Sequence, residues 1–312
     1  MVFKANITMT KKISILLLLI MTFFFNACDK YDNKVYMPEY SKSLSLDHKK
    51  EYIFSIHPLH NTLHVFKTYQ PLLDYLNEHL ENEKLVIETS KKYATYDKKL
   101  ADRKFDFSLG NPYQTVQSLK YGYHVFGKMG DDDIFRGLIL TRKDSNINTI
   151  NDLKGKKVCY PAPTAIAATM MPQWHLYKLG LDVNNDITSL FVGSQESSIM
   201  NVYLGKVVAG TTWIPSWKAF KKERPDIANQ LVVTWKSDPL INNGLFAKDT
   251  VPKVLLEKVS NLIANLHTHK RGKLILSKMG ISKYEKANDD TYNIVKRFII
   301  DYKKHIRNKE VK

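Results

Sequence analysis

The sequence predicts an α/β fold of two lobes, each built from alternating strands and helices. Short β-rich runs alternate with stretches of helical apolar spacing from residue 52 onwards, a pattern that favours parallel sheets covered by helices. A second strand–helix series begins after residue 153, and a further β-rich run at residues 240–247 follows it. We therefore expect the chain to form one lobe, pass to a second, and return to the first.

The first lobe is expected to open with a strand at residues 52–56 and a helix at residues 65–80. Aromatic and aliphatic residues dominate the first segment, and apolar residues recur near helical spacing along the second. The other elements expected before the chain leaves this lobe are a strand at 85–89, a short helix at 97–101, and strands at 105–109 and 124–128.

The second lobe is expected over residues 138–239, and the first lobe over residues 51–137 together with residues 240–312. Gly180 and Gly205 each follow a helical stretch, at a place where glycine commonly ends a helix. The elements expected in the second lobe are strands at 138–142, 157–160 and 189–192 and helices at 164–179 and 198–204. The elements expected after the returning strand are amphipathic helices at 254–267, 272–279 and 291–306.

The segment at residues 160–171 has the features of an anion-binding turn at the start of a helix. The β-rich run ends at Pro161 and Pro163, which restrict the turn, and Thr164 can cap the helix that follows. The first amides of a helix have no acceptor within it, so they can point at a bound oxyanion. Ala165 and Ala167 leave this backbone uncovered. The alternative is an ordinary capped helix start that binds only water.

The N-terminal residues predict export. Three lysines precede an apolar run at 13–25, which is short for a bilayer span and suits a secretory signal peptide over residues 1–27. Residues 25–28 resemble a bacterial lipobox, in which Cys28 carries the lipid and becomes the new N-terminus. An ordinary cleaved signal with an incidental cysteine is the alternative. Residues 28–50 are polar and lack a sustained apolar period, so we expect a flexible tether there.

Composition restricts the classes of partner. The formal net charge is +16, but the positive residues are dispersed and no nucleic-acid motif is present, so we do not expect a nucleic-acid partner. A basic surface can instead draw anionic ligands or favour an anionic membrane, or be a solvated face without a role. With Cys28 lipidated, Cys159 is left without a cysteine to pair with. Its position at a strand end favours a small buried side chain over a nucleophile.

Several segments match a known family in the family's own order. The matching segments are residues 69–72, 104–107 with 111–114, 152–156, 160–171 and 192–198. On these residues the chain resembles the phosphate, phosphite and phosphonate substrate-binding proteins of ABC transporters, which have the two-lobe type II periplasmic-binding-protein fold. The likeness spans roughly residues 51–300.

The resemblance implies a ligand held in a cleft between the lobes, where strand ends, loops and helix N-termini converge. It implies that Tyr93 and Tyr113 contribute hydroxyl groups from the first lobe, with Asn111 beside them. For Tyr93, packing as a half-buried tyrosine is an equal alternative.

In the second lobe, the family often has a Ser-Thr-Ser run at the start of the anion-binding helix. The corresponding residues here are Ala165, Ile166 and Ala167. Thr164 is the one hydroxyl that remains, so we expect backbone amides to carry more of the binding. Amides and neutral hydroxyls are adequate for a phosphate-like group in a dry cleft.

Two further positions depart from the family. Gln195 stands where many relatives have a histidine, and Val208 stands where relatives have an acidic residue. The missing carboxylate argues against a ligand with a cationic tail, although Glu196 can replace it or serve only as a dipole partner of its helix. Trp213, rather than Trp217, is the better candidate for an apolar wall of the cleft, and core packing is its alternative.

The resemblance therefore implies a lipid-anchored substrate-binding protein of an ABC importer, which captures phosphate, phosphite or a small phosphonate with an uncharged tail. We expect no catalysis and no cofactor. The expected partners are the phosphorus oxyanion, an ABC permease in the inner membrane, and the membrane itself through the lipid anchor. The protein is expected to be a monomer facing the periplasm or the cell exterior.

Three other functions remain open at this point. A ligand-sensing subunit of a membrane receptor would use the same cleft. An enzyme on this fold is the second, although no catalytic motif supports it. A transition-metal site is the third, because His57, His60 and His64 are close in sequence and a further ligand could join them.

Overall fold

The computed structural model describes residues 49–307. The signal peptide expected at residues 1–27, the lipidated Cys28 and all but the last two residues of the expected tether at 28–50 lie outside the described residues. Within the described part of the chain, no helix combines the length and the apolar character needed to cross a membrane.

The first lobe is built on a six-stranded mixed sheet. Its strands are β1 (Lys50–Ile56), β2 (Glu83–Thr89), β3 (Phe107–Gly110), β4 (Tyr123–Met129), β10 (Gly244–Lys248) and β11 (Tyr284–Glu285). They lie in the order β11-β4-β10-β3-β1-β2. The expected parallel arrangement holds for β1, β2 and β3. β10 is antiparallel to β3 and β4, because the returning chain enters the sheet at the carboxyl end of β3, where Gly244 pairs with Gly110.

The second lobe is built on a five-stranded mixed sheet. Its strands are β5 (Gly137–Arg142), β6 (Lys156–Tyr160), β7 (Ile187–Phe191), β8 (Ala209–Trp213) and β9 (Leu231–Lys236). They lie in the order β7-β6-β8-β5-β9. β6 is parallel to β7 and β8, whereas β5 is antiparallel to β8 and β9. The expectation of parallel pairing is therefore wrong for β5, which crosses over from the first lobe.

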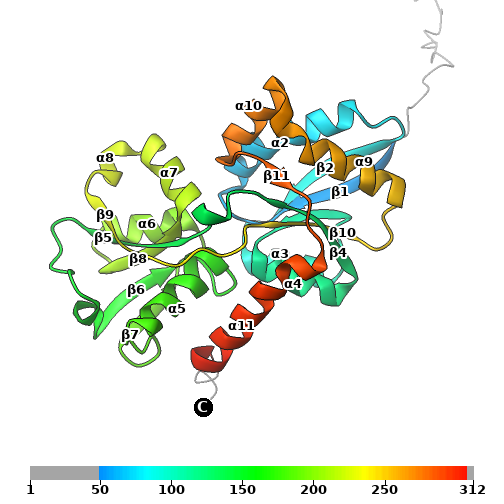
Figure 1. Cartoon of the computed structure of the whole chain (residues 1–312). Coiled ribbons are helices and arrows are strands. Elements are labelled where there is room, and N and C mark those ends of the chain that lie inside the picture. Colours follow the sequence, from blue (N-terminus) through cyan, green and yellow to red (C-terminus); the bar gives the residue numbers. More distant parts are fainter. Residues whose placement is uncertain (1–48, 308–312) are drawn as a thin grey trace, which may run out of the picture. The chain divides into compact units, whose positions relative to one another are not determined.

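Helices surround both sheets (Figure 1). Those of the first lobe are α2 (Thr62–Glu78), α3 (Tyr93–Ala101), α4 (Pro112–Ser118), α9 (Lys253–Ala264), α10 (Lys270–Met279) and α11 (Asn293–His305). Those of the second lobe are α5 (Met171–Lys178), α6 (Gln195–Tyr203), α7 (Ile214–Glu223) and α8 (Pro225–Ala228). In the first lobe, α2, α9 and α10 lie on one side of the sheet, and α3 and α4 lie on the other (Figure 1).

Local sequence explains where these helices begin. Asn61 caps α2 by accepting a hydrogen bond from the amide of His64 at 3.0 Å, and Asn111 caps α4 in a reciprocal capping box with Gln114. In α2 the buried residues recur at helical spacing, so one face packs on the sheet and the other meets solvent.

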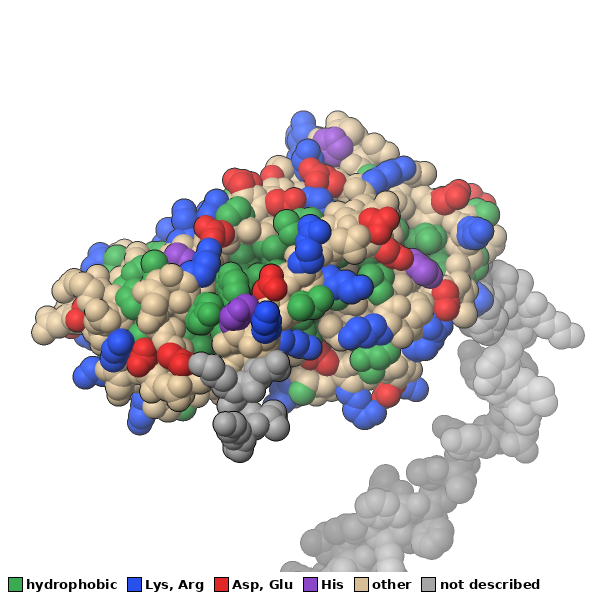
Figure 2. Space-filling view, turned by 60° about the horizontal axis from the view of Figure 1, so that its bottom comes forward, with side chains coloured by type: hydrophobic (Ala, Val, Ile, Leu, Met, Phe, Trp, Pro, Cys, Tyr) green, Lys and Arg blue, Asp and Glu red, His purple; other side chains and the backbone are tan. Residues whose placement is uncertain are grey.

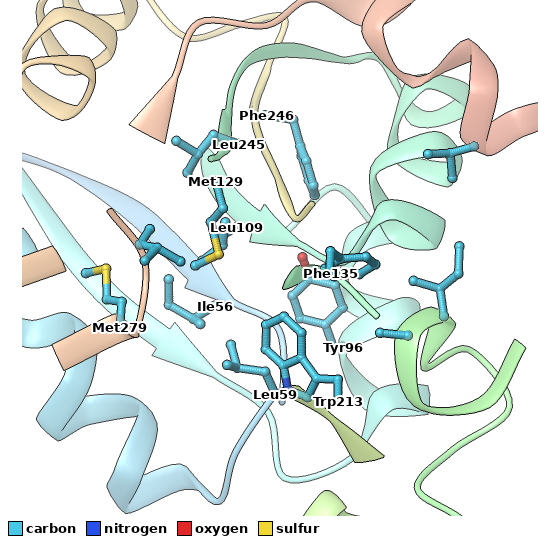
Figure 3. Packing of buried hydrophobic residues seen from close by; sticks show 14 of the residues in the cluster. Ile56, Leu59, Tyr96, Leu109, Met129, Phe135, Trp213, Leu245, Phe246 and Met279 are labelled. Atoms are coloured by element: carbon cyan, nitrogen blue, oxygen red, sulfur yellow. The ribbon is translucent and has the colours of Figure 1, made fainter. Parts of the chain in front are cut away.

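The main hydrophobic core extends from the first sheet to the junction of the lobes. The rings of Phe54 and Phe107 stack with centroids 6.0 Å apart. Figure 3 shows other members of this core, among them Phe246 from β10 and Trp213 from β8, so one cluster contains residues of both sheets. A smaller core that includes Trp217 lies in the second lobe alone.

The chain crosses between the two sheets after β4 and after β9. The lobe limits expected at 137/138 and 239/240 fall at the start of β5 and between β9 and β10, and as residue-level limits they stay a prediction. The C-terminal helix α11 also contacts the second lobe. The hydroxyl of Tyr302 donates to Gln173, and the amide of Asn184 donates to the carbonyl of Ile306 at 2.7 Å.

Candidate functional site

A small cavity lies where the two lobes meet. Most of its walls come from segments that follow the carboxyl ends of strands or begin helices, the usual place for a ligand in open α/β sheets. The space open to the centre of a water-sized sphere is about 10 Å³, so the cavity is compact. Its lining residues are His57, Leu59, Tyr93, Asn111, Phe135, Ala165, Ile166, Ala167, Ala168, Gln195, Trp213 and Asn243.

Backbone amides form the second-lobe side of this cavity. Residues Ile166–Met170 form a π turn that leads directly into α5, in place of the single α-helix expected at 164–179. The amides of Ile166, Ala167 and Ala168 stand at the start of this turn and donate to no group among residues 49–307 outside it. All three residues are buried. Because buried N–H groups nearly always have a partner, three such groups beside a cavity make this turn a candidate site.

Two threonine hydroxyls and the close approach of β5 hold this turn in place. Thr169 donates its hydroxyl to the carbonyl of Ala162 at 2.8 Å, and Thr211 of β8 donates to the carbonyl of Ala168. β5 passes close behind the turn at Gly137, where an added Cβ would lie 2.3 Å from the carbonyl oxygen of Ala167. The carbonyl of Ala168 and the chain just before the turn are thus held by hydrogen bonds, which limits how far the amides of the turn can rotate.

Thr164 does not cap this turn, and that expectation is wrong. Its hydroxyl donates to Oδ2 of Asp97 in α3 at 3.0 Å, and its carbonyl accepts from Nδ2 of Asn111 at 2.9 Å. Both partners belong to the first lobe, so Thr164 connects the two lobes by hydrogen bonds and does not cap the turn. Thr164 lies beside the cavity and is not one of its lining residues.

Tyr93 and Asn111 line the cavity from the first lobe, and their contact with a ligand stays a prediction. Tyr93 is the first residue of α3 and is buried, and burial raises the pKa of its phenol, with the nearby Asp97 adding to the effect. Its hydroxyl therefore keeps its proton and can donate it to an anion. Asn111 is held in place because its Oδ1 accepts from the amide of Gln114 at 3.0 Å.

His57 also lines the cavity, although sequence reasoning did not place it among the ligand-binding residues. It directly follows β1, and its Nδ1 lies 3.2 Å from the carbonyl oxygen of Leu109 in β3. Burial is the largest influence on the ring and lowers the pKa of His57 to about 3. The imidazole is therefore neutral at ordinary pH.

Gln195 and Trp213 line the cavity from the second lobe. Gln195 begins α6, and its Oε1 accepts from the hydroxyl of Thr212 at 2.8 Å. Its NH₂ group faces the hydroxyl of Tyr93 and has a second N–H for a further partner. The indole N–H of Trp213 donates to Ser216 at 2.6 Å, so this residue offers the cavity only its apolar surface. Its ring packs edge-on against Phe135 with centroids 5.5 Å apart.

Trp213, Phe135 and Leu59 together form an apolar wall (Figure 3). The two readings of Trp213, cleft wall and core packing, are therefore compatible, since the same ring belongs to the main core and lines the cavity. Trp217 lies elsewhere, stacked on Phe220 in the core of the second lobe.

Glu196 and Tyr113 are not among the lining residues. Oε1 of Glu196 lies 3.6 Å from Nδ1 of His60, a contact between the lobes at the edge of the cavity. Burial alone would raise the pKa of Glu196, but its hydrogen bond to His60 brings it below the ordinary value. Tyr113 packs partly buried against the main core, and burial raises its pKa.

The cavity has no charged lining. None of the described residues that line it is Lys, Arg, Asp or Glu. An anion there would be held by N–H dipoles and neutral hydroxyl groups, which are strong donors when water is excluded. Without a carboxylate on the wall, a ligand ammonium group would have no counter-charge.

The geometry gives little support to a transition-metal site or to a cysteine nucleophile. In the described part of the chain, no group of three or more His, Cys, Asp or Glu residues could hold a metal ion. His60 and His64 have ring centroids 4.4 Å apart, while His57 turns to the cavity. Cys159 is fully buried, and burial raises the pKa of its thiol to about 11, so it is a poor nucleophile.

Charged side chains of both signs are mixed on one face of the molecule. Figure 2 shows Lys and Arg side chains scattered over the face in view and mixed with Asp and Glu. Several basic residues are paired with acids, for example Arg271 with Glu78 and Lys128 with Glu285. Such a mixed surface does not resemble the continuous basic face of a nucleic-acid-binding protein.

Sequence reasoning missed five of the residues around the cavity. They are His57, Leu59, Phe135, Ala168 and Asn243. Two signals were available for them. His57 follows the first strand of a parallel set, where ligand-binding residues gather, and Ala168 continues the small-residue run of the turn. Phe135 and Asn243 lie in the two crossings between the lobes, where the sequence carries no such pattern.

Comparisons with known proteins agree with this geometry. A family model described as "ABC transporter, phosphonate, periplasmic substrate-binding protein" matches residues 54–292. The "Phosphate-import protein PhnD" of Mycolicibacterium smegmatis is 22% identical over 222 residues, which is 66% of this chain and 69% of the relative.

Solved structures share the fold. The binding protein component of a phosphonate ABC transporter from Pseudomonas aeruginosa superposes with a TM-score of 0.75 at 16% identity, covering 82% of this chain and 87% of the other. PhnD1 of Prochlorococcus marinus, solved in complex with methylphosphonate, gives a TM-score of 0.73 at 18% identity, covering 80% of this chain and 97% of the other. At these identities the likeness shows the two-lobe type II periplasmic-binding-protein fold alone.

Proposed function

The chain belongs to the family of periplasmic substrate-binding proteins of phosphonate ABC transporters, and from this premise we propose that its cavity captures a small phosphorus oxyanion. The family is a class of transport proteins and not of enzymes. It implies export to the periplasm and an ABC permease as partner. The ligand, the residues that hold it, the lipid anchor and the monomeric state are our proposals.

The observation that carries the proposal is the group of three unpartnered amides at Ile166, Ala167 and Ala168. They are buried and line a compact cavity that contains no charged side chain. A tetrahedral oxyanion supplies several acceptors around one centre, which is what converging N–H groups require. In our proposal the hydroxyl of Tyr93 and the NH₂ groups of Gln195 and Asn111 complete the donors.

The size of the cavity supports a small ligand. The centre of a water-sized sphere can move within about 10 Å³, which corresponds to roughly one bond length in each direction from the middle. This is about the room that one water molecule needs, so a tetrahedral oxyanion, whose oxygen atoms all lie one bond from phosphorus, reaches its limit. A long tail exceeds it, and the apolar wall with Trp213 accommodates at most a small uncharged group. We therefore propose inorganic phosphate, phosphite or a small phosphonate.

The contacts between the lobes support capture by closure. Asn111 and Asp97 of the first lobe bind Thr164 of the second through two hydrogen bonds. His64 of α2 lies 3.3 Å from Glu223 of α7 across the same junction. A ligand that bridges the turn and Tyr93 would add to these contacts and favour the closed form, which we propose is the form presented to the permease.

We propose that lipidated Cys28 anchors the protein to the membrane. The support is the lipobox-like residues 25–28 and their position after an apolar leader. Expression in a bacterial host with a radiolabelled fatty acid tests this: Cys28 should carry the label, and Cys28→Ala should remove both the label and the membrane-bound fraction. Label that remained in Cys28→Ala would refute the anchor.

The oxyanion proposal is tested by calorimetry of the purified protein with a panel of phosphate, phosphite, methylphosphonate, aminoethylphosphonate and sulfate. We expect dissociation constants of about 1 μM or lower for at least one of the first three. We expect aminoethylphosphonate to bind more weakly than methylphosphonate, because no carboxylate meets its ammonium group. Traces without heat for every phosphorus compound would refute the proposal.

A further inference from the structure

We propose that Nε2 of His57 accepts a hydrogen bond from a P–OH group of the ligand, and that the cavity is thereby selective for oxyanions that still carry a proton. This inference rests on the proposed oxyanion site and adds to it a residue that determines which protonation form is bound. Donors dominate the second-lobe side of the cavity, whereas His57 offers the ligand an acceptor.

The hydrogen bond to Leu109 fixes the tautomer of His57. A carbonyl oxygen can only accept, so the ring nitrogen that contacts it, Nδ1 at 3.2 Å, must carry the proton. In a neutral ring, Nε2 then has a lone pair and no proton. No group among residues 49–307 hydrogen-bonds to Nε2, and His57 lines the cavity. Nε2 is therefore the ring nitrogen left for a ligand.

The surroundings keep this ring neutral. The aromatic rings of Tyr93 and Tyr96 in α3 pack edge-on against His57, with centroids 6.3 and 6.4 Å from that of the imidazole. Burial raises the pKa of both phenols, so neither supplies a negative charge. His60, on the same loop, further disfavours a positive charge on His57. Two carboxylates lie near the junction. Asp97 of α3 accepts hydrogen bonds from Gln114 and Thr164, and Glu196 of α6 lies beside His60, so each is engaged by a residue other than His57.

Asn243 also lines the cavity with a polar side chain, but it does not select between a protonated and an unprotonated oxygen. Its Oδ1 is buried without a partner in the described part of the chain, and its Nδ2 has only a long contact of 3.5 Å to the sulfur of Met129. An amide can turn by half a rotation and present either group. His57 cannot, because its other nitrogen is held by Leu109.

The consequence differs between ligands that are otherwise alike. Sulfate has no proton to donate at ordinary pH. Phosphate keeps a P–OH group both as the monoanion and as the dianion. Methylphosphonate has a P–OH group as the monoanion and loses it as the dianion. An unprotonated oxygen facing the lone pair of Nε2 would leave both groups buried without a hydrogen bond, which is unfavourable.

Calorimetry over a pH series tests this, with methylphosphonate and inorganic phosphate as probes. Above the second pKa of methylphosphonate, its apparent dissociation constant should rise about tenfold per pH unit, because only the protonated fraction binds. Over the same interval, the constant for phosphate should change by no more than about threefold. In His57→Gln the slope for methylphosphonate should fall to less than half, since glutamine can donate, and sulfate should begin to bind. His124→Gln, at an exposed histidine of β4, serves as the matched control.

The pH slopes of phosphate and methylphosphonate binding to the unaltered protein test the role of His57 even if His57→Gln fails to fold. Equal pH slopes for phosphate and methylphosphonate would overturn the inference, and so would a slope that is unchanged in a folded His57→Gln variant. If both probes bind and only these pH effects are absent, the oxyanion site stands without the role of His57. If neither probe binds at any pH, the proposed function fails and this inference fails with it.

Discussion

The amide of Ile166 provides the most specific test of the anion-binding turn. Replacing this residue with proline removes one of the three unpartnered N–H groups at the first position of the turn, where proline is best tolerated. The preceding residue, Ala165, has φ −77° and ψ 87°, so it is already outside the helical region that proline disfavours. The backbone should therefore accept the change while one donor is lost.

The expected loss of affinity follows from one hydrogen bond to a charged group. Such a bond contributes about 1.5–3 kcal/mol, so the dissociation constant for phosphate or methylphosphonate should rise about 10- to 100-fold. The Ile166 side chain is 1% exposed, and losing it also lowers the free energy of unfolding by about 2–5 kcal/mol. Ile166→Ala is the matched control, because it loses the side chain and keeps the N–H group.

The assay is calorimetry of both variants at a temperature where thermal unfolding shows each to be folded. The difference in affinity between Ile166→Pro and Ile166→Ala measures the contribution of the amide. Equal affinities in the two variants would refute the reasoning that this amide contacts the ligand.

Three further predictions test the walls around this turn. Gly137→Ala places a Cβ 2.3 Å from the carbonyl oxygen of Ala167, so it should lower the free energy of unfolding by about 1–3 kcal/mol and weaken binding. A chemical-denaturation curve that matches that of the unaltered protein would contradict this close packing of β5 on the turn. Asn111→Ala removes a helix cap and a hydrogen bond between the lobes, so it should weaken oxyanion binding several-fold. The control Asn61→Ala loses a comparable cap of about 1 kcal/mol on α2 and should bind normally. Equal binding by the two variants would refute a role for the bond between the lobes. Burial lowers the pKa of His57 from 6.5 to about 3, so the unfolded state binds the extra proton and stability falls as pH falls. Between about pH 6.5 and pH 4.5, the free energy of unfolding should drop by about 2–3 kcal/mol more in the unaltered protein than in His57→Gln. Parallel plots of unfolding free energy against pH for the two proteins would refute a buried neutral ring.

The strand–helix alternation allowed most elements to be predicted. The strands with aliphatic and aromatic runs, such as β1 and β6, lie within two residues of their predicted limits. β8 was missed as a strand because four of its five residues, Ala209–Thr212, are small or polar and all five are buried, so the segment shows no alternation. Antiparallel pairing of β5 and β10 depends on where the chain re-enters each sheet, which local sequence does not encode.

The candidate site was predictable where it depends on one segment. The run of small residues after Pro163 predicted uncovered amides at a helix start, and in the structure this run forms a π turn that lines the cavity. Thr164 was misread as a cap because its hydroxyl meets Asp97, a residue of the other lobe that is distant in sequence. His57 was missed although its place after β1 gave a signal, whereas Asn243 lies in the crossing between β9 and β10, where the sequence carries no such pattern.

The central claim is that the amides of Ile166, Ala167 and Ala168 hold a tetrahedral oxyanion between the lobes. A crystal structure of the protein grown with saturating methylphosphonate tests this most directly. We predict a tetrahedral ligand in the cavity, with its oxygen atoms about 2.7–3.2 Å from these amide nitrogens. The same crystals would contradict the account if the amides were bonded to protein groups, or if the ligand lay anywhere else on the chain.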